Sequence, residues 1–396
     1  MIPGAVPSFP RICQSTGVRL AGDCRFDAAA ARTHAMECEG HAKASQMKDH
    51  APGTLVVRAD AGVASGSGHV MRCLAIAQVW QEIGGDGVFA LHETGLYEPR
   101  LRSEGLGVAV IDAAPGSAED AAQVIELAHA KGAAWAVVDG YCFDQTYQLA
   151  LKEAGLKLVF VDDYGHAERY YADIILNPNP QGKSIAYNRR ERHTRVLAGP
   201  EFALIRREFR RVRTSQTQIP LVAKRLLVTM GGSDENNFTE VVLRALPLLH
   251  TPGLEATVVV GSANPNKGIL REVAASSGNM VKLVENTSAM PALMKDADFA
   301  VTAGGATCYE LAFLGVPMIA VTLAQNQEPT CRALAERGVA VDAGWFHSLK
   351  AESLGKRRLE IMADPDGRKS LGNAGRSLVD GEGARRVVAS MRESKE

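Results

Sequence analysis

Short apolar runs alternate with longer amphipathic runs through most of this 396-residue chain, and this alternation restricts its fold more than any other feature. In the first half, the expected helices lie between strands and occupy residues 69–82, 117–130 and 145–154. The expected strands occupy residues 55–58, 87–91, 107–111, 134–139, 157–162, 174–176 and 195–198. Strands that alternate with helices favour a parallel sheet with helices on both faces.

A second alternating unit follows a basic segment that ends near Pro220. We interpret that segment, which begins at Glu201, as a linker whose arginines lie on a solvent-exposed helix face. The second unit has an expected long helix at residues 238–249 and is mostly helical after Pro329. Its expected strands occupy residues 225–230, 255–260, 281–284, 299–302 and 318–321. The chain is therefore expected to form two doubly wound α/β domains.

The expected domain boundaries follow from this pattern. Residues 54–222 form the first domain, and residues 223–396 form the second, which ends in terminal helices. Residues 1–53 show no sustained period, so we expect either a disordered extension or a translation start placed too far upstream, with Met47 as the true start. A small ordered cap is the alternative for this segment.

Composition argues against several classes of protein. With 46% hydrophobic and 22% charged residues and a net charge of -1, the chain gives no support for binding to nucleic acid or to an acidic membrane surface. It has no apolar run of roughly 18 residues, so no membrane span is expected. Its N-terminus has no apolar h-region, so no secretory signal is expected either. Its seven cysteines lack metal-ligand spacing and fit free thiols in a reducing compartment. We expect a cytoplasmic monomer without a metal or a cofactor.

A glycine-rich loop separates the first expected strand from the first long helix. Residues 58–73 read RADAGVASGSGHVMRC, so Gly68 and His69 stand at the helix N-terminus and Arg72 lies one turn further on the same face. A helix N-terminus suits an anion, and His69 is a candidate general base there. Met71 occupies the place of the third glycine of a dinucleotide fingerprint, so the loop does not indicate NAD. The alternative is an ordinary turn in which His69 only caps the helix.

Further polar loops follow other expected strands. Asp139, Gly140 and Tyr141 come after one strand, and residues 162–165, Asp-Asp-Tyr-Gly, come after the next. Ligands of parallel α/β sheets bind at the carboxyl ends of strands, so these loops and the His69 loop are candidates for one site. Asp and Gly also favour ordinary turns, which is the alternative for each loop.

The second half repeats the sequence of a strand, a glycine-rich loop and a helix N-terminus. Residues 231–237 read GGSDENN and residues 303–312 read AGGATCYELA, so both loops can offer backbone N–H groups to an anion. Glu310 lies about one turn into the second helix, where its carboxylate can accept from two neighbouring sugar hydroxyls. A carboxylate there also stabilises the helix dipole by about 0.3–1 kcal/mol, which is the alternative role. Asn326 and Gln327 follow the next strand and can offer amide groups to a ligand.

Taken together, these motifs resemble the PseG family, the UDP-2,4-diacetamido-2,4,6-trideoxy-β-L-altropyranose hydrolases of the bacterial pseudaminic acid pathway. The resemblance covers roughly residues 55–392. It rests on residues 58–73, 161–179, 231–239, 289–310 and 325–327. It implies a GT-B-like α/β fold, similar to MurG-type glycosyltransferases, in which two doubly wound Rossmann-type domains face each other across a cleft. It also implies cleavage of a UDP-linked deoxy sugar in nonulosonic acid biosynthesis.

The resemblance implies that His69 is the catalytic residue and that the UDP site lies in the second half, at its two glycine loops, Glu310 and Asn326. The residues expected to bind the UDP-sugar are Gly68, Arg72, Tyr141, Gly232, Ser233, Asn237, Gly305, Glu310, Asn326 and Gln327. The N-terminal extension has no counterpart in the family pattern.

The nature of the leaving group indicates which catalytic groups are needed. UDP departs readily, so one base that deprotonates water suffices in place of the two carboxylates of most glycosidases. Helix N-termini and backbone N–H groups can meet the growing negative charge without a metal. Attack of water at C1 would invert that centre and release UDP. The rivals are a UDP-sugar glycosyltransferase, in which His69 deprotonates an acceptor hydroxyl, and a catalytically silent nucleotide-sugar-binding protein.

Overall fold

The computed structural model describes residues 51–393 with short gaps at residues 63–65, 94, 96, 214–218, 250, 278–279, 353, 355–360 and 362. The expected extension of residues 1–53 and the alternative start at Met47 lie outside the described residues, except for residues 51–53. The described residues belong to one compact unit that contains two sheets.

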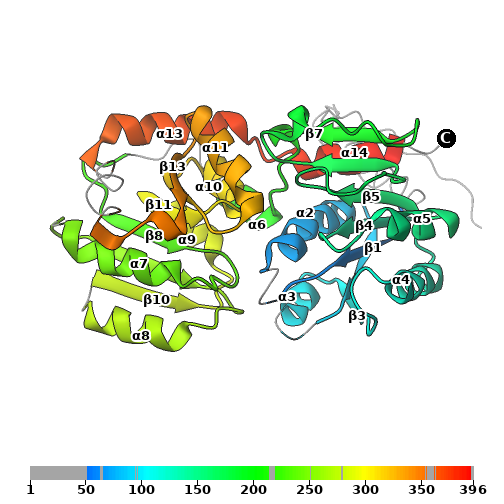
Figure 1. The fold of residues 1–396 in the computed structure, drawn as a ribbon, viewed down its shortest axis with the longest axis horizontal. Helices are drawn as coiled ribbons and strands as arrows, with labels where there is room; N and C mark the ends of the chain where they lie inside the picture. The colour runs from blue at the N-terminus through cyan, green and yellow to red at the C-terminus, as the bar shows by residue number, and fades with distance from the viewer. Residues whose placement is uncertain are drawn as a thin grey trace, which may run out of the picture. The chain divides into compact units, whose positions relative to one another are not determined.

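The first sheet is built from the N-terminal half. Within the described residues it has seven strands in the order β3-β2-β1-β4-β5-β6-β7, and all neighbours are parallel. The strands are β1 (Thr54–Ala59), β2 (Asp86–Leu91), β3 (Gly107–Val110), β4 (Trp135–Asp139), β5 (Lys157–Val161), β6 (Ile174–Asn177) and β7 (Arg195–Ala198). The connecting helices are α2 (Gly68–Glu82), α3 (Glu98–Ser103), α4 (Ala118–Ala130) and α5 (Gln145–Glu153) (Figure 1). The expected parallel sheet is confirmed, and α3 is an addition to it.

Strand β1 is buried on both faces of this sheet. Leu55 and Val57 join the apolar core that contains α2, whereas Val56 joins the core that contains α4 and α5. Successive side chains of a strand point to opposite faces, so an unbroken apolar run such as 55–57 is typical of a strand covered by helices on both sides.

The second sheet is built from the C-terminal half. In the described part of the chain it has six parallel strands in the order β10-β9-β8-β11-β12-β13. The strands are β8 (Arg225–Thr229), β9 (Glu255–Val260), β10 (Val281–Glu285), β11 (Phe299–Ala303), β12 (Met318–Thr322) and β13 (Val341–Trp345). The helices of this half are α7 (Phe238–Ala245), α8 (Lys267–Ser276), α9 (Met290–Asp296), α10 (Thr307–Leu314), α11 (Glu328–Glu336) and α13 (Pro365–Leu378) (Figure 1).

Strand β13 corrects the expectation that the chain is mostly helical after Pro329. It pairs with β12, and the register shifts between Ala320 and Val321. Asp342 and Gly344 interrupt its apolar pattern, and Gly344 has a φ of 79°. A polar residue and a glycine in five residues remove the period-two signal that identifies a strand.

The segment between the halves is also different from the expected exposed linker. Arg206 is only 9% exposed, and α6 (Arg207–Val212) contacts α2 and α9. The Arg207 guanidinium donates to Oε2 of Glu104 at 3.0 Å. These basic side chains pair with carboxylates of the protein because the segment lies between packed helices, which the charge pattern alone does not show.

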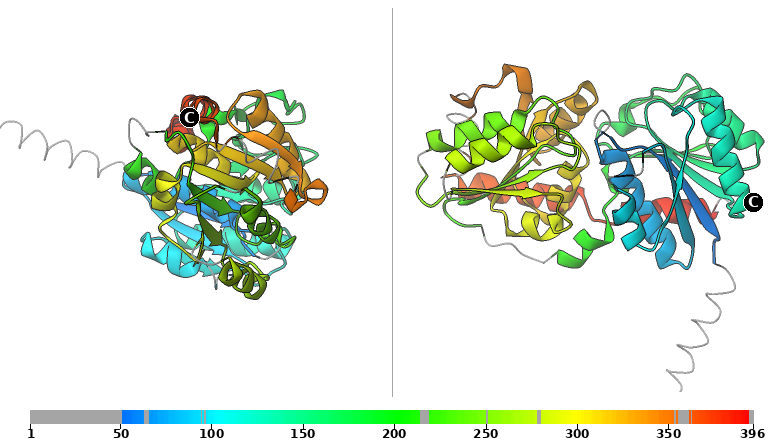
Figure 2. Two further views of the ribbon diagram at one scale, coloured as in Figure 1. Left: turned by 90° about the vertical axis from the view of Figure 1, so that its left-hand side faces the viewer. Right: turned by 90° about the horizontal axis from the view of Figure 1, so that it is seen from below.

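Helix α14 (Gly383–Glu393) packs against α2, so the chain returns to its N-terminal half at its end. Ala384, Val387 and Met391 belong to the same apolar core as Leu55. Figures 1 and 2 show this red helix beside the blue and green elements of the first half. The expected second domain of residues 223–396 is therefore wrong for its last helix.

Helix α14 is fitted closely to its neighbours at its first residue. A Cβ atom on Gly383 would lie 2.2 Å from the backbone oxygen of Ala203, so the two backbones approach as only glycine permits. In the described part of the chain, α14 included, no helix combines the length and apolarity required to cross a lipid bilayer.

Candidate active site

A cavity of about 1050 Å³ is lined by loops that follow strands of both sheets. In the first half these loops include those after β1, β4, β5 and β6, and in the second half they come after β8, β9, β10, β11 and β12. The carboxyl ends of parallel strands are where ligands of such sheets bind. The residues expected from the sequence that line this cavity are Gly68, His69, Arg72, Tyr141, Gly232, Ser233, Gly305, Glu310, Asn326 and Gln327.

His69 lies in the first turn of α2 with its Nδ1 atom 2.6 Å from Oδ1 of Asp139, the last residue of β4. Asp139 is fully buried. Burial alone would raise the pKa of Asp139, but Arg72 and His69 outweigh it and hold that pKa well below its usual range. Because the carboxylate is ionised, Nδ1 carries a proton toward it, and Nε2 is the ring nitrogen left to act on a ligand.

Arg72 bridges two carboxylates at the floor of this site. It donates to Oδ2 of Asp139 from Nε at 2.6 Å and to Oδ1 of Asp163 from Nη1 at 2.8 Å. Its Nη2 atom donates to Oδ1 of Asp139 at 2.7 Å and to Oδ2 of Asp163 at 3.1 Å. Arg72 was expected to bind substrate, but its guanidinium is used to fix the two aspartates, one of which orients His69.

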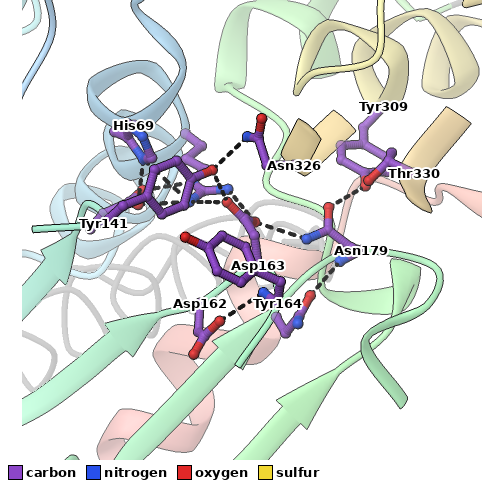
Figure 3. Close-up of polar contacts among 12 residues, drawn as sticks. His69, Tyr141, Asp162, Asp163, Tyr164, Asn179, Tyr309, Asn326 and Thr330 are labelled. Atoms are coloured by element: carbon purple, nitrogen blue, oxygen red, sulfur yellow. Dashed lines mark hydrogen bonds and ion pairs between the residues drawn. The ribbon is translucent and has the colours of Figure 1, made fainter. Parts of the chain in front are cut away.

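Asp163 connects this array to Tyr141 and Asn179 (Figure 3). Its Oδ2 atom accepts from the Tyr141 hydroxyl at 2.7 Å, and its Oδ1 atom accepts from Nδ2 of Asn179 at 2.8 Å. Burial and the neighbouring Asp163 carboxylate raise the pKa of Tyr141, so its hydroxyl stays protonated and donates. The Tyr141 ring lies edge-on to the His69 ring, with 5.0 Å between centroids.

Two hydrogen bonds join this network to the C-terminal half. Nδ2 of Asn326 donates to the Tyr141 hydroxyl at 2.8 Å, and the Tyr309 hydroxyl donates to Oδ1 of Asn179 at 2.6 Å (Figure 3). Gln327, the neighbour of Asn326, uses Oε1 to accept from the backbone N–H of Leu323 at 3.0 Å. The amide of Asn326 thus reaches across the cavity, whereas the amide oxygen of Gln327 fixes its own loop.

The first glycine loop of the C-terminal half meets the His69 loop. A Cβ atom on Gly232 would lie 2.8 Å from the backbone nitrogen of Ser67, so glycine is required for this approach. Asp234, with a φ of 46°, caps the following helix by accepting from the backbone N–H groups of Phe238 and Thr239 at 2.9 and 3.0 Å. This arrangement leaves the backbone at residues 231–233 facing the cavity.

Among the described residues that were expected to contact the substrate, only Asn237 does not line the cavity. It precedes α7 with a φ of 50°, and its Nδ2 atom donates to Oε2 of Glu240 at 2.5 Å. Its neighbour Asn236 lines the cavity instead. The left-handed turn directs the Asn237 amide nitrogen to its own helix, and the expected contact of Asn237 with substrate stays a prediction.

Glu310 lies one turn into α10 and is 8% exposed. Its Oε1 atom accepts from Nε and Nη2 of Arg206 at 3.0 and 2.7 Å. Burial raises the pKa of Glu310, and the opposing effect of Arg206 is smaller. Both residues line the cavity. The sequence suggested only the helix dipole as an alternative role for Glu310, and the ion pair was not expected.

Sequence reasoning named the loops of Asp139 and Asp163 as candidates for one site but gave the two aspartates no role, and it missed Asn179, Arg206 and Tyr309. A signal existed for the two aspartates, since both follow buried strands in loops that the sequence marks as polar. For Arg206 the signal was a basic segment that we interpreted as solvated. In the described residues, no group of three or more His, Cys, Asp or Glu side chains is arranged to hold a metal ion.

The two parallel Rossmann-like sheets define an α/β protein of the GT-B class, as expected. MurG of Acinetobacter baumannii superposes with a TM-score of 0.58 at 17% identity, over 86% of this chain and 100% of MurG. Residues 225–366 match the glycosyltransferase family 28 C-terminal domain.

Sequence comparison gives the family. The chain is 30% identical over 244 residues to the spore coat polysaccharide biosynthesis protein SpsG of Bacillus subtilis. The aligned region covers 61% of this chain and 70% of SpsG. The chain therefore belongs to the same family as SpsG. It is also 24% identical over 295 residues to the UDP-2,4-diacetamido-2,4,6-trideoxy-beta-L-altropyranose hydrolase of Campylobacter jejuni, over 73% of this chain and 98% of that enzyme.

Proposed function

We propose that this protein is an enzyme that acts on UDP-sugars and hydrolyses a UDP-linked 2,4-diacetamido-2,4,6-trideoxy hexose. The products are UDP and the free sugar, an intermediate of pseudaminic or related nonulosonic acid biosynthesis. The similarity to the Campylobacter jejuni hydrolase supports the substrate class. The observation that carries the proposal is the pairing of His69 with the buried carboxylate of Asp139 at the edge of a cavity lined by two glycine-rich loops.

His69 is the proposed general base. Nε2 accepts a proton from water, and the water oxygen forms a bond to C1 of the sugar as the bond from C1 to the diphosphate oxygen breaks. The electron pair of that bond leaves with UDP, and C1 is inverted. Asp139 keeps Nδ1 protonated, orients the ring and stabilises the imidazolium that forms.

The C-terminal half is the proposed UDP site. Backbone N–H groups of the loops at residues 231–233 and 304–307, the second of which leads into α10, can meet the charge that develops on the diphosphate. Glu310 lines the cavity and is the proposed acceptor for the ribose hydroxyls. A nucleoside diphosphate leaves without a protonated carboxylic acid, which is consistent with a single base on the other half.

A glycosyltransferase is the second candidate, because residues 225–366 match a glycosyltransferase family 28 domain. In that reaction His69 would deprotonate an acceptor hydroxyl instead of water. One fold can support both reactions, so the fold does not decide between them.

The deciding experiment is to incubate the protein with UDP-2,4-diacetamido-2,4,6-trideoxy-β-L-altropyranose without an acceptor and to follow UDP release, with UDP-N-acetylglucosamine as a comparison. Hydrolysis in H₂¹⁸O should place the label on C1 of the sugar and leave UDP unlabelled. Label in UDP would mean attack at phosphorus and would exclude the proposed role of His69. Release that requires an added acceptor would favour the transferase, and UDP binding without turnover would indicate a silent binding protein.

A further inference from the structure

We propose that Arg206, from the segment between the two halves, is a positioning residue of the nucleotide site that holds Glu310 toward the ribose hydroxyls. This inference rests on the proposed UDP site. It assigns a role to a segment that the sequence suggested was only a linker.

The geometry leaves one oxygen of Glu310 for a ligand. Both hydrogen bonds from Arg206, at 3.0 and 2.7 Å, fall on Oε1. Among the described side chains, none donates to Oε2, while Glu310 as a whole lines the cavity. A carboxylate whose first oxygen is fixed twice has a set orientation, and its second oxygen can accept from two adjacent hydroxyls.

Arg206 is itself held from two sides. Its Nη1 atom donates to Oε1 of Glu208 at 2.9 Å, and its guanidinium carbon lies 4.9 Å from the centre of the Phe209 ring. Glu208 in turn accepts from Arg100 of α3 at 2.8 Å and from Gln78 of α2 at 3.2 Å. A guanidinium fixed by a carboxylate and an aromatic ring loses little further freedom when it orients a neighbour.

Arg206 also favours the ionised form of the Glu310 carboxyl group. Burial raises the pKa of this carboxyl group and the nearby Glu208 adds to the effect, while Arg206 opposes both. An ionised acceptor makes hydrogen bonds roughly twice as strong as those of a neutral one. Arg206 thereby provides both the orientation and the charge that recognition of a ribose requires.

The test compares two ligands that differ only at the ribose, UDP and 2′,3′-dideoxy-UDP, by calorimetric titration. The variants are Arg206→Gln, Arg206→Lys and, as a matched control in the same segment, Arg210→Gln, which removes an ion pair with Glu82 instead. We expect Arg206→Gln to weaken UDP about tenfold to hundredfold and to change the affinity for dideoxy-UDP by less than about twofold. Arg206→Lys should give an intermediate loss, and Arg210→Gln should bind both ligands like the wild type.

Equal loss of affinity for both ligands, or no loss for either, would overturn the inference, as would a wild-type protein that does not distinguish the ligands. Should Arg206→Gln fail to fold, Arg206→Lys provides the same comparison, because lysine cannot place two N–H groups on Oε1 in the arginine geometry. Failure of the proposed function has a different signature. The ribose-specific loss would then persist in a protein that binds UDP and hydrolyses no UDP-sugar.

Discussion

The Nδ1 atom of His69 lies 2.6 Å from Oδ1 of Asp139, although 70 positions separate the two residues in the sequence. The pairing of β1 with β4 creates this contact, because Ala59 at the end of β1 is in register with Asp139 at the end of β4. The helix that follows β1 therefore begins beside the carboxylate that ends β4.

Replacing His69 by Asn should separate catalysis from binding. Asn keeps a polar side chain but does not take a proton from water near neutral pH, so kcat should fall by about 10²–10⁴-fold. UDP affinity should stay close to that of the wild type, because the proposed UDP contacts lie in the other half. Steady-state kinetics and UDP titration measure both quantities. The exposed His129 of α4 offers the control, and His129→Asn should be fully active.

Asp139→Asn should lower kcat by a comparable factor without removing the base. An amide no longer requires Nδ1 of His69 to carry the proton, and it loses the negative charge that favours the imidazolium. The variant should also be less stable, since Arg72 keeps only Asp163 as a buried counter-ion. Kinetics and thermal unfolding should be measured beside Asp112→Asn, an exposed control. Full activity of Asp139→Asn would contradict the orienting role.

Glu310→Gln should affect both binding and stability. Loss of a charged acceptor weakens a hydrogen bond by about 1.5–3 kcal/mol, so UDP affinity should drop roughly tenfold or more. Removing one partner of a buried pair costs about 3–5 kcal/mol, and the loss should lie toward the low end because Arg206 keeps Glu208. Unfolding in urea and UDP titration report the two effects, with the exposed Glu336→Gln as the control. Unchanged UDP affinity in a less stable protein would limit Glu310 to a structural role.

The Asp162–His166 pair should make stability depend on pH. Burial alone would lower the pKa of His166, but Asp162, 3.6 Å away, outweighs it and raises that pKa above its ordinary value of 6.5. The stabilisation is fully present below about pH 6.5, the unfolded value, and is lost as pH rises through the higher folded value. The gap in unfolding free energy between the wild type and His166→Gln should therefore be larger at pH 6 than at pH 9. A gap that grows with pH would show that the sign is wrong.

Met391→Ala should destabilise the N-terminal half although the residue lies near the C-terminal end of the chain. Met391 is fully buried in the core that contains α2, and truncation of a buried methionine typically costs about 2–5 kcal/mol. The neighbouring exposed Arg392→Ala should change stability by no more than about 0.5 kcal/mol. Denaturant unfolding followed by hydrogen exchange in α2 would locate the effect.

The local sequence pattern predicted most strands and helices of the fold. Apolar runs such as 55–57 predict buried strands because both faces of the sheet are covered, and the glycine loop places His69 at a helix N-terminus. Strand order does not follow from such runs. The positions of Asp139 and Asp163 beside Arg72 depend on β1, β4 and β5 being neighbours, which only tertiary packing decides.

The unexpected features share one physical cause, which is long-range packing. The basic segment around Arg206 has a charge pattern typical of an exposed helix. In the structure, carboxylates from distant parts of the chain surround it, namely Glu82, Glu104 and Glu310. Similarly, the amphipathic pattern of α14 indicates an apolar face but not the sheet that the face covers. Side chains whose partners lie more than a hundred residues away leave no local period to detect.

The return of α14 to the first half has a consequence for exchange of segments between related genes. A single crossover in the segment that joins the halves would produce a hybrid in which α2 from one parent packs against α14 from the other. Such a hybrid must reconcile Val387 and Met391 of one lineage with an N-terminal core shaped in another. A hybrid that keeps α2 and α14 from the same parent needs two crossover points, one before β8 and one before Gly383.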